Sequence, residues 1–248
     1  MSSDPRFTPH QILAPHYTSE QDKQPFLRRV FDDSARHYER IASWGFLGTG
    51  NWYRRQALTR AGLGPGMAVV DVASGTGITA RAAAKIAGGP QLVTCVEPSR
   101  GMLEESRRRL TAQHIQGSAD AIPLPEGCCD FLSMGFALRH VENLESAFRE
   151  FRRIVRPGGK LLIMDITKPE GRLGNWLVRF YFRDLLPRFT RLVTGSREAT
   201  YLMEYYWETL DGMVDPALVL EALAASGWAN PVRHVEASIF TEYTAERP

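Results

Sequence analysis

The spacing of apolar and polar positions changes along this chain, and the change separates predicted strands from predicted helices. Between Met67 and Pro169, short apolar runs alternate with segments whose apolar residues recur at helical spacing. Runs of roughly four to eight residues are typical of buried strands, and the wider spacing is typical of amphipathic helices. The predicted strands are 68–72, 92–96, 114–117, 130–136 and 160–166, separated by helices at 77–87, 99–110 and 143–155. This alternation predicts an α/β fold with a mostly parallel sheet and helices on both faces.

Helical patterns flank this alternating core on both sides. The predicted helices are 25–40 and 51–61 before it, and 173–193, 196–213 and 216–226 after it, followed by closing strands at 228–235 and 237–245. The helix at 173–193 contains Pro187, near which we expect it to break. We expect a flexible arm over 1–23 and a single domain over 24–248. The parts of the domain are N-terminal helices (24–66), the alternating core (67–169), a helical lid (170–227) and closing strands (228–248).

Composition narrows the class of protein. The chain has 248 residues and a formal net charge of +2, which does not favour nucleic acid as a partner. No apolar run reaches the roughly 18 residues of a membrane-spanning helix, and the N-terminus lacks the apolar core of a signal peptide. Cys95, Cys128 and Cys129 do not have the spacing of a metal site, so we expect no metal. Unpaired cysteines fit a reducing compartment, and we expect a cytoplasmic protein.

A glycine turn, Asp71-Val-Ala-Ser-Gly-Thr-Gly77, follows the first predicted strand of the core. Gly75 and Gly77 lack a Cβ and can adopt positive φ, so the backbone can approach a ligand closely. The helix that follows points its free N–H groups toward the same place. A lone Gly-x-Gly also occurs where a strand and a helix merely pack tightly. Strand, turn and helix in this order nevertheless predict a nucleotide-type cofactor site, which makes 67–169 a cofactor-binding core.

Acidic residues at successive strand ends favour S-adenosylmethionine over a nicotinamide dinucleotide. Asp71 could engage an ammonium group directly or through water, whereas it would repel a pyrophosphate. Glu97, about 20 residues after the turn, could accept both ribose hydroxyls. Asp120 could accept a hydrogen bond from adenine, with Met102 and Ile122 beside the ring. Each acid alone could be a solvated side chain, but the carboxyl ends of parallel strands meet in one crevice.

Three further motifs carry a family resemblance. They are Phe31-Asp-Asp-Ser-Ala-Arg-His-Tyr38-Glu39, Phe136-Ala-Leu-Arg139-His140-Val141, and the segment from Arg153 to Pro169 with its Arg-Pro-Gly-Gly sequence. Together they resemble the motifs of the ubiquinone/menaquinone biosynthesis C-methyltransferases, in which the second motif reads Phe-Gly-Leu-Arg-Asn-Val. The resemblance runs from about Phe31 to Trp228. It implies a Rossmann-like class I methyltransferase fold with a seven-stranded sheet, and S-adenosyl-L-methionine as cofactor.

The motifs and the resemblance together assign residues to the cofactor site. These are Tyr38, Asp71, Ala73, Ser74, Gly75, Gly77, Glu97, Pro98, Met102, Asp120, Ala121 and Phe136. We expect the methyl group to pass to carbon of a small hydroxylated acceptor, aromatic or quinol-like. Two alternatives stay open: an O- or N-methyltransferase of a secondary metabolite, and a non-catalytic cofactor-binding subunit of a biosynthetic complex.

Arg139 and His140 follow the fourth predicted strand, where the methyl group should be presented, and are the candidate catalytic residues. A phenol carbon becomes a good nucleophile when its neighbouring hydroxyl loses a proton. His140 could accept that proton, and Arg139 could stabilise the phenolate. The alternative is structural: Arg139 would pair with Asp165 or Asp130, and His140 would cap the next helix.

The segment 173–191 mixes aromatic residues with arginines. Arg179 and Arg183 are four residues apart and share one face of the predicted helix. That face could touch a membrane surface beside an apolar lid, or it could be an ordinary solvated basic face. The same helical insert could also form the surface of a homodimer.

Overall fold

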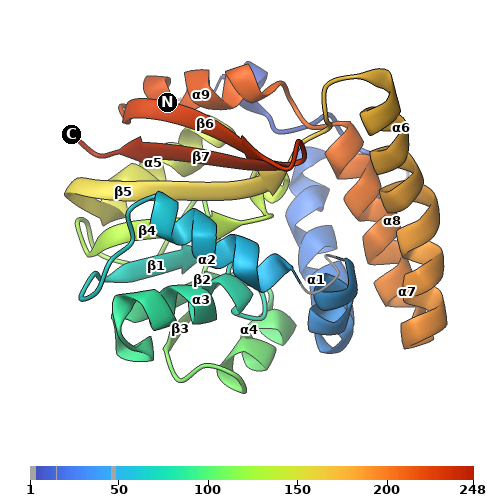
Figure 1. Ribbon diagram of the computed structural model, residues 1–248, viewed down its shortest axis with the longest axis horizontal. Helices are drawn as coiled ribbons and strands as arrows, with labels where there is room; N and C mark the ends of the chain where they lie inside the picture. The colour runs from blue at the N-terminus through green and yellow to red at the C-terminus, as the bar shows by residue number, and fades with distance from the viewer. Residues whose placement is uncertain (1–3, 15, 46–48) are drawn as a thin grey trace.

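Within the described residues, 4–14, 16–45 and 49–248, the computed structural model has one seven-stranded sheet in the order β3-β2-β1-β4-β5-β7-β6 (Figure 1). The first five strands run parallel, and β7 pairs antiparallel with both β5 and β6. The strands are β1 (Val69–Val72), β2 (Val93–Glu97), β3 (Gln113–Gln116), β4 (Cys129–Gly135), β5 (Val155–Ile166), β6 (Ala229–Glu236) and β7 (Phe240–Glu246). The predicted α/β fold with a mostly parallel seven-stranded sheet is confirmed.

Helices cover both faces of the sheet because neighbouring residues on a strand point to opposite faces. Val69 and Phe131 pack in one buried cluster with α2 and α3. Val70 and Leu132 pack in a second cluster with α5 and α9. The flanking helices are α2 (Gly50–Arg60), α3 (Ile78–Ala87), α4 (Arg100–Arg107), α5 (Leu144–Ile154) and α9 (Pro216–Ala225). Burial on both faces explains why the parallel strands read as nearly continuous apolar runs.

A further group of helices stands beside the end of the sheet at which β5 finishes (Figure 1). Its members are α1 (Glu20–Gly45), α6 (Arg172–Arg179), α7 (Leu186–Thr194) and α8 (Arg197–Asp211). Helix α1 contacts α4 and α8, and α8 contacts α7. The expected N-terminal helices and the helical insert before the last two strands are therefore both present, although residues 46–48 of the N-terminal helices lie outside the described residues.

The order of the strands fixes the place of a ligand crevice. From β1 the chain builds β2 and β3 on one side of the sheet, and then β4 and β5 on the other. Neighbouring strands β1 and β4 therefore lead to helices on opposite faces, which opens a crevice at their carboxyl ends. Asp71 and Ser133 are register partners near this point.

The N-terminal segment packs on the domain, which differs from the flexible arm expected over 1–23. Phe7 in the short helix η1 (Pro5–Phe7) is 3% exposed and belongs to the same buried cluster as α9. Nδ2 of Asn143 donates a hydrogen bond to the carbonyl oxygen of Asp4 at 2.9 Å. One buried aromatic side chain and one hydrogen bond thus hold a segment whose overall composition is polar. Residues 1–3 and 15 of the expected arm lie outside the described residues.

The first helix of the lid is interrupted earlier than expected. A π-helical stretch, η4 (Phe180–Leu185), separates α6 from α7. Pro187 lies in the first turn of α7, directly after this stretch. The predicted break near Pro187 therefore lies close to the start of α7, but the interruption of the α-helix already begins at Phe180.

Candidate active site

The turn after β1 has left-handed backbone at Ala73, Gly75 and Gly77, with φ values of 52°, 55° and 80°. A Cβ added at Gly75 would meet no atom within 4 Å, so this side of the turn is open. A Cβ added at Gly77 would lie 2.5 Å from Oγ of Ser106, and Gly77 is the N-cap of α3. Gly75 therefore gives a ligand access to the backbone. Gly77 instead allows the turn to pack closely against Ser106 of α4.

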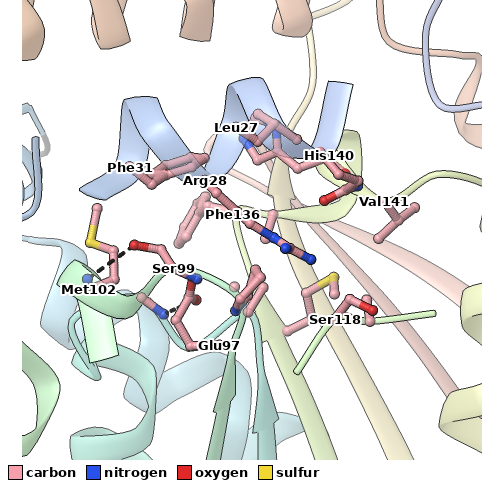
Figure 2. A pocket seen from close by; sticks show the side chains of 18 of the residues that line it. Leu27, Arg28, Phe31, Glu97, Ser99, Met102, Ser118, Phe136, His140 and Val141 are labelled. Carbon is pink, nitrogen blue, oxygen red and sulfur yellow. Dashed lines mark hydrogen bonds between the residues drawn. The ribbon is translucent and has the colours of Figure 1, made fainter. Parts of the chain in front are cut away.

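A pocket enclosing about 740 Å³, including the part open to solvent, lies at this end of the sheet. Figure 2 shows Leu27, Arg28 and Phe31 on α1 above the pocket and Glu97, Ser99 and Met102 below it. The predicted site residues that line this pocket are Tyr38, Ala73, Gly75, Glu97, Pro98, Met102, Asp120, Phe136 and His140. Residues from distant parts of the chain thus converge on one cavity, as the sequence analysis expected.

Glu97 at the end of β2 is held by two backbone groups. Its Oε2 accepts a hydrogen bond from the N–H of Gly75 at 2.8 Å, and its Oε1 accepts one from the N–H of Ser99 at 2.9 Å. Burial raises the pKa of Glu97 to about 7, although both N–H groups act in the opposite direction. The carboxylate is fixed at the wall of the pocket, and its remaining lone pairs can accept hydrogen bonds from ligand hydroxyls.

Asp71 lies behind the turn and does not line the pocket. Its side chain is fully buried, and its Oδ1 accepts a hydrogen bond from Oγ of Ser133 at 2.6 Å. Its Oδ2 has no partner among the described residues, and burial raises its pKa to about 7. A buried carboxylate oxygen without a partner carries a desolvation cost that a nearby cation or water relieves. Asp71 can therefore act on a cofactor ammonium through the field of its charge or through water.

The remaining predicted residues lie around the pocket without lining it. Ser74 is buried, and its Oγ has no partner among the described residues. Ala121 is exposed and forms an isolated bridge with Ser118, which does line the pocket. Ile122, expected beside the adenine ring, is buried in the cluster under α5. The sequence pattern could not tell which side of a loop faces the cavity, and the cofactor roles of Ser74 and Ala121 stay predictions.

Asp120 occupies the far end of the same pocket. Its Oδ1 accepts a hydrogen bond from Oγ of Ser146 at 2.9 Å, and its Oδ2 accepts one from the N–H of Glu142 at 3.5 Å. Burial raises its pKa. A carboxylate held in this way can accept a hydrogen bond from an exocyclic amino group, which is the role expected for it.

The sequence analysis assigned Tyr38 of α1 to this pocket but missed the other residues of that helix that line it. The lining residues it did not assign there are Gln24, Leu27, Arg28 and Phe31. Asp32 fastens the helix to the N-terminus of α4: its Oδ1 accepts hydrogen bonds from Oγ of Ser99 at 2.6 Å and from the N–H of Gly101 at 2.8 Å. The Phe31-Asp32 pair of the first motif was the available signal, and it explains why that motif lies far from the turn in sequence.

A second pocket of about 600 Å³, measured in the same way, adjoins the first on the side of the lid. Phe31, Tyr38, Phe136 and His140 line both pockets and therefore form their boundary. The other lining residues are Ile41, Ala42, Arg54, Phe182, Leu186, Leu202, Met203 and Tyr206. Phe136 has a φ of 62°, an unfavourable backbone for an aromatic residue, and such strain is typical of functional sites.

His140 lies at this boundary with a free ring nitrogen. Its Nδ1 is buried and has no partner among the described residues. Its ring stacks on Tyr205 with centroids 5.8 Å apart. Burial, together with the positive charge of Arg139, holds its pKa well below 6.5, so the imidazole is neutral at pH 7. The predicted alternative of a helix cap is wrong, because the side chain of Asn143 caps α5.

Arg139 is buried among three partners. Its Nη2 lies 3.2 Å from Oδ1 of Asp165 and donates a hydrogen bond to the carbonyl oxygen of Phe136 at 3.1 Å. Its Cζ lies 4.0 Å from the centroid of the Tyr206 ring. The structural alternative with Asp165 is therefore the pairing that forms, whereas Asp130 pairs with Arg156.

The residues of the first pocket fit S-adenosylmethionine. The open glycine turn matches the amino-acid end of this cofactor. The fixed carboxylates of Glu97 and Asp120 match its ribose and its adenine. The unpartnered Oδ2 of Asp71 adds negative charge behind the turn, which suits the cationic amino-acid end of this cofactor.

Comparison with known proteins gives the same picture. The model of the ubiE/COQ5 methyltransferase family matches residues 17–217. A demethylmenaquinone methyltransferase from Mycolicibacterium paratuberculosis is 30% identical over 232 residues, which cover 93% of this chain and 98% of the relative. The ubiquinone/menaquinone biosynthesis C-methyltransferase UbiE from Hahella chejuensis is 28% identical over 209 residues, covering 79% and 84% of the two chains.

Solved structures share the fold at lower identity. A SAM-dependent methyltransferase from Thermotoga maritima superposes with a TM-score of 0.62 at 18% identity and covers 89% of this chain and 99% of that one. A phosphoethanolamine N-methyltransferase from Haemonchus contortus, solved with S-adenosyl-L-methionine, has a TM-score of 0.65 at 17% identity and covers 94% and 60%. These likenesses establish the class of fold.

The raised pKa of Glu97 predicts that cofactor binding depends on pH. Ribose hydroxyls donate to the charged carboxylate, so binding lowers a pKa that is about 7 in the free protein and releases a proton below that pH. We expect the affinity for S-adenosylhomocysteine to fall by about tenfold as the pH drops from about 8 to about 6. Calorimetry in buffers of different ionisation enthalpy measures both the affinity and the proton release. Glu97→Gln should reduce the release, whereas the exposed Glu104→Gln should leave it unchanged; a pH-independent wild-type affinity would contradict this account.

Proposed function

The chain belongs to the ubiE/COQ5 methyltransferase family and uses S-adenosylmethionine, and we propose that it methylates a ring carbon of a small hydroxylated aromatic or quinol-like acceptor. The observation that carries the proposal is the pair of adjoining pockets. One fits the methyl donor, and the other is lined mainly by apolar and aromatic side chains. A flat, apolar acceptor with a few hydroxyl groups matches the second pocket.

The names of the relatives support the same class of acceptor. The similar proteins from mycobacteria are demethylmenaquinone methyltransferases, and those named UbiE are C-methyltransferases of quinone biosynthesis. A demethylated quinone in its reduced form is a hydroxylated aromatic ring. We carry this chemistry over to the present chain as the acceptor class, without naming one molecule.

The proposed reaction begins with the acceptor hydroxyl. Its proton moves to Nδ1 of the neutral His140, and the electron pair left on oxygen makes the neighbouring ring carbon nucleophilic. When bound, S-adenosylmethionine supplies an electrophilic methyl group and keeps the electrons of the broken carbon–sulfur bond on sulfur. The ring carbon then releases its own proton to water and regains aromaticity, and His140 returns the first proton to the ring oxygen. Phe31, Tyr38 and Phe136 orient the reactants and exclude water at the boundary between the pockets.

The product distinguishes this proposal from its alternatives. With [methyl-13C]S-adenosylmethionine and 1,4-naphthalenediol as acceptor, we expect a new carbon resonance in the aryl-methyl region of the NMR spectrum. A methoxy or N-methyl resonance across a panel of phenols, amines and quinols would replace carbon methylation with the O- or N-methyltransferase alternative. Cofactor binding without turnover on the whole panel would indicate a non-catalytic subunit.

His140→Ala should lower kcat by about 100-fold or more, because the variant lacks the proton acceptor. The affinity for S-adenosylhomocysteine should stay within about a few-fold of wild type, since other residues hold the cofactor. His234→Ala on the exposed side of β6 is the matched control. Because the pKa of His140 lies well below 6.5, wild-type kcat at saturating cofactor should not fall between about pH 8 and pH 6.5. Unchanged turnover in His140→Ala would remove this residue from the mechanism.

We further propose that the outer face of α6, η4 and α7 touches an anionic bilayer, from which a lipid-like acceptor enters. Large apolar side chains are exposed on this segment, including Leu173 at 72% and Leu192 at 83%, with Trp176, Leu177, Phe180 and Leu185 between them. Exposed Arg179, Arg183 and Arg188 provide charge complementary to anionic headgroups. The opposite side of this segment lines the second pocket through Phe182 and Leu186. In the part of the chain that the structure describes, no helix has the length and apolarity to cross a membrane.

Vesicle co-sedimentation tests this surface. We expect binding to vesicles of phosphatidylcholine with phosphatidylglycerol, weaker binding to phosphatidylcholine alone, and at least about tenfold weaker binding when Arg179, Arg183 and Arg188 are changed to Glu. The control is the same charge change at the exposed Arg29, Arg36 and Arg55. Equal loss in both triple variants would mean a general charge effect. A stable dimer whose interface covers α6 and α7 would assign the surface to a second copy.

A further inference from the structure

Two buried arginines lie beside the second pocket, and their surroundings differ. Arg139 is paired with Asp165 at 3.2 Å. Arg54 is 6% exposed and lines the pocket directly. Its Nη1 donates a hydrogen bond to the carbonyl oxygen of Gly50 at 3.0 Å, and its Nε has no partner among the described residues. Only a backbone carbonyl, and no carboxylate of the described residues, pairs with this buried cation.

The environment of Arg54 makes an unpaired charge costly. Its Cζ lies 4.6 Å from the centroid of the Phe136 ring, and the pocket around it is mainly apolar. Burial lowers the pKa of Arg54, which records the cost of removing the guanidinium from water. A buried charge without a counter-charge destabilises a protein, so such a group is a candidate for binding an oppositely charged ligand.

Few titratable groups face Arg54. Glu39 lines a small cavity together with Arg54, but its carboxylate pairs with Arg81 and Arg109. The four titratable groups that influence Arg54 most are Tyr38, Asp71, Tyr206 and Tyr53, in that order. The tyrosines are neutral at pH 7, since burial raises the pKa of Tyr38 and brings that of Tyr206 to about 12. Asp71 is the acid of this group, and it is already engaged with Ser133. The buried Oη of Tyr206 also has no partner among the described residues. The pocket therefore offers a cation and a free hydroxyl donor.

We propose that Arg54 binds the phenolate oxygen of the acceptor and so selects acceptors with an ionisable ring hydroxyl. This rests on the proposed function, because it places the acceptor in the second pocket. Tyr206 can donate a second hydrogen bond to the same oxygen. An Arg–oxyanion contact in a dry pocket is short and strong, and it lowers the pKa of the bound hydroxyl. The proton then passes more easily to His140, a weak base.

This assignment changes the role expected for Arg139. The sequence analysis gave Arg139 the phenolate, but its charge is balanced by Asp165 in the structure. Arg139 is instead a positioning residue, because it joins the end of β4 to β5 and supports the ring of Tyr206 from 4.0 Å. The unbalanced positive charge next to the pocket belongs to Arg54.

The test uses 1-naphthol as the probe and does not depend on turnover. Naphtholate absorbs at longer wavelength than naphthol, so absorbance reports the pKa of the bound hydroxyl on protein saturated with S-adenosylhomocysteine. In wild type we expect this pKa to lie about 1 to 3 units below that of free 1-naphthol. Arg54→Met should abolish the shift, and Arg54→Lys should keep part of it. The matched control is Arg55→Met, the exposed neighbour on the same helix, which should behave as wild type.

Several outcomes would overturn the proposal. A wild-type shift that persists in Arg54→Met would assign the phenolate to another group, and no shift in wild type would remove the oxyanion site altogether. Arg54→Met could fail to fold, which loss of S-adenosylhomocysteine binding would show. The test is then made on the wild-type protein alone. Its affinity for 1-naphthol should then rise with pH through the bound pKa, whereas that for 1-methoxynaphthalene should not. Carbon methylation could fail in the product assay while this shift is present, so the two claims fail separately.

Discussion

The carboxylate of Glu97 joins the three parts of the chain that make the donor site. It accepts the N–H of Gly75 from the turn after β1 and the N–H of Ser99 at the start of α4, while it ends β2 itself. Ser99 in turn donates to Asp32, which fixes α1 over the pocket. One buried acid therefore sets the position of the turn, of a helix N-terminus and, through one further bond, of the covering helix. Such a group is costly to bury, and its hydrogen bonds together with the bound ligand offset that cost.

The same principle organises the acceptor side. Charged groups are removed from water there too: the charge of Arg139 is balanced by Asp165, and one oxygen of Asp71 accepts a hydrogen bond from Ser133. Arg54 is the exception described above, and it faces the cavity in which a ligand would supply the missing charge. His140 stands where both cavities meet and is kept neutral by its surroundings. Electrostatic preorganisation of this kind needs no large movement of the protein during the reaction.

The sequence predicted those features that depend on local patterns. The strands, the glycine turn and the position of Glu97 follow from apolar periodicity and from the turn chemistry of Gly75 and Gly77. Contributions from distant segments were harder to predict. The pattern of α1 shows an apolar face, but not that Leu27 and Phe31 cover a cofactor pocket. In the sequence Arg54 is one arginine among several in a predicted helix, and only the tertiary structure shows that it is buried without a carboxylate while Arg55 beside it is exposed.

The central claim is that a methyl donor and an ionised aromatic acceptor occupy the two adjoining pockets. A crystal structure of the protein with S-adenosylhomocysteine and 1-naphthol tests it most directly. The account predicts the nucleoside against Glu97 and Asp120, the naphthol oxygen within hydrogen-bond distance of Arg54, and the ring carbon beside that oxygen facing the sulfur across the boundary at Phe136 and His140. A naphthol bound elsewhere, or bound with its oxygen away from Arg54 and its ring turned from the sulfur, would contradict it.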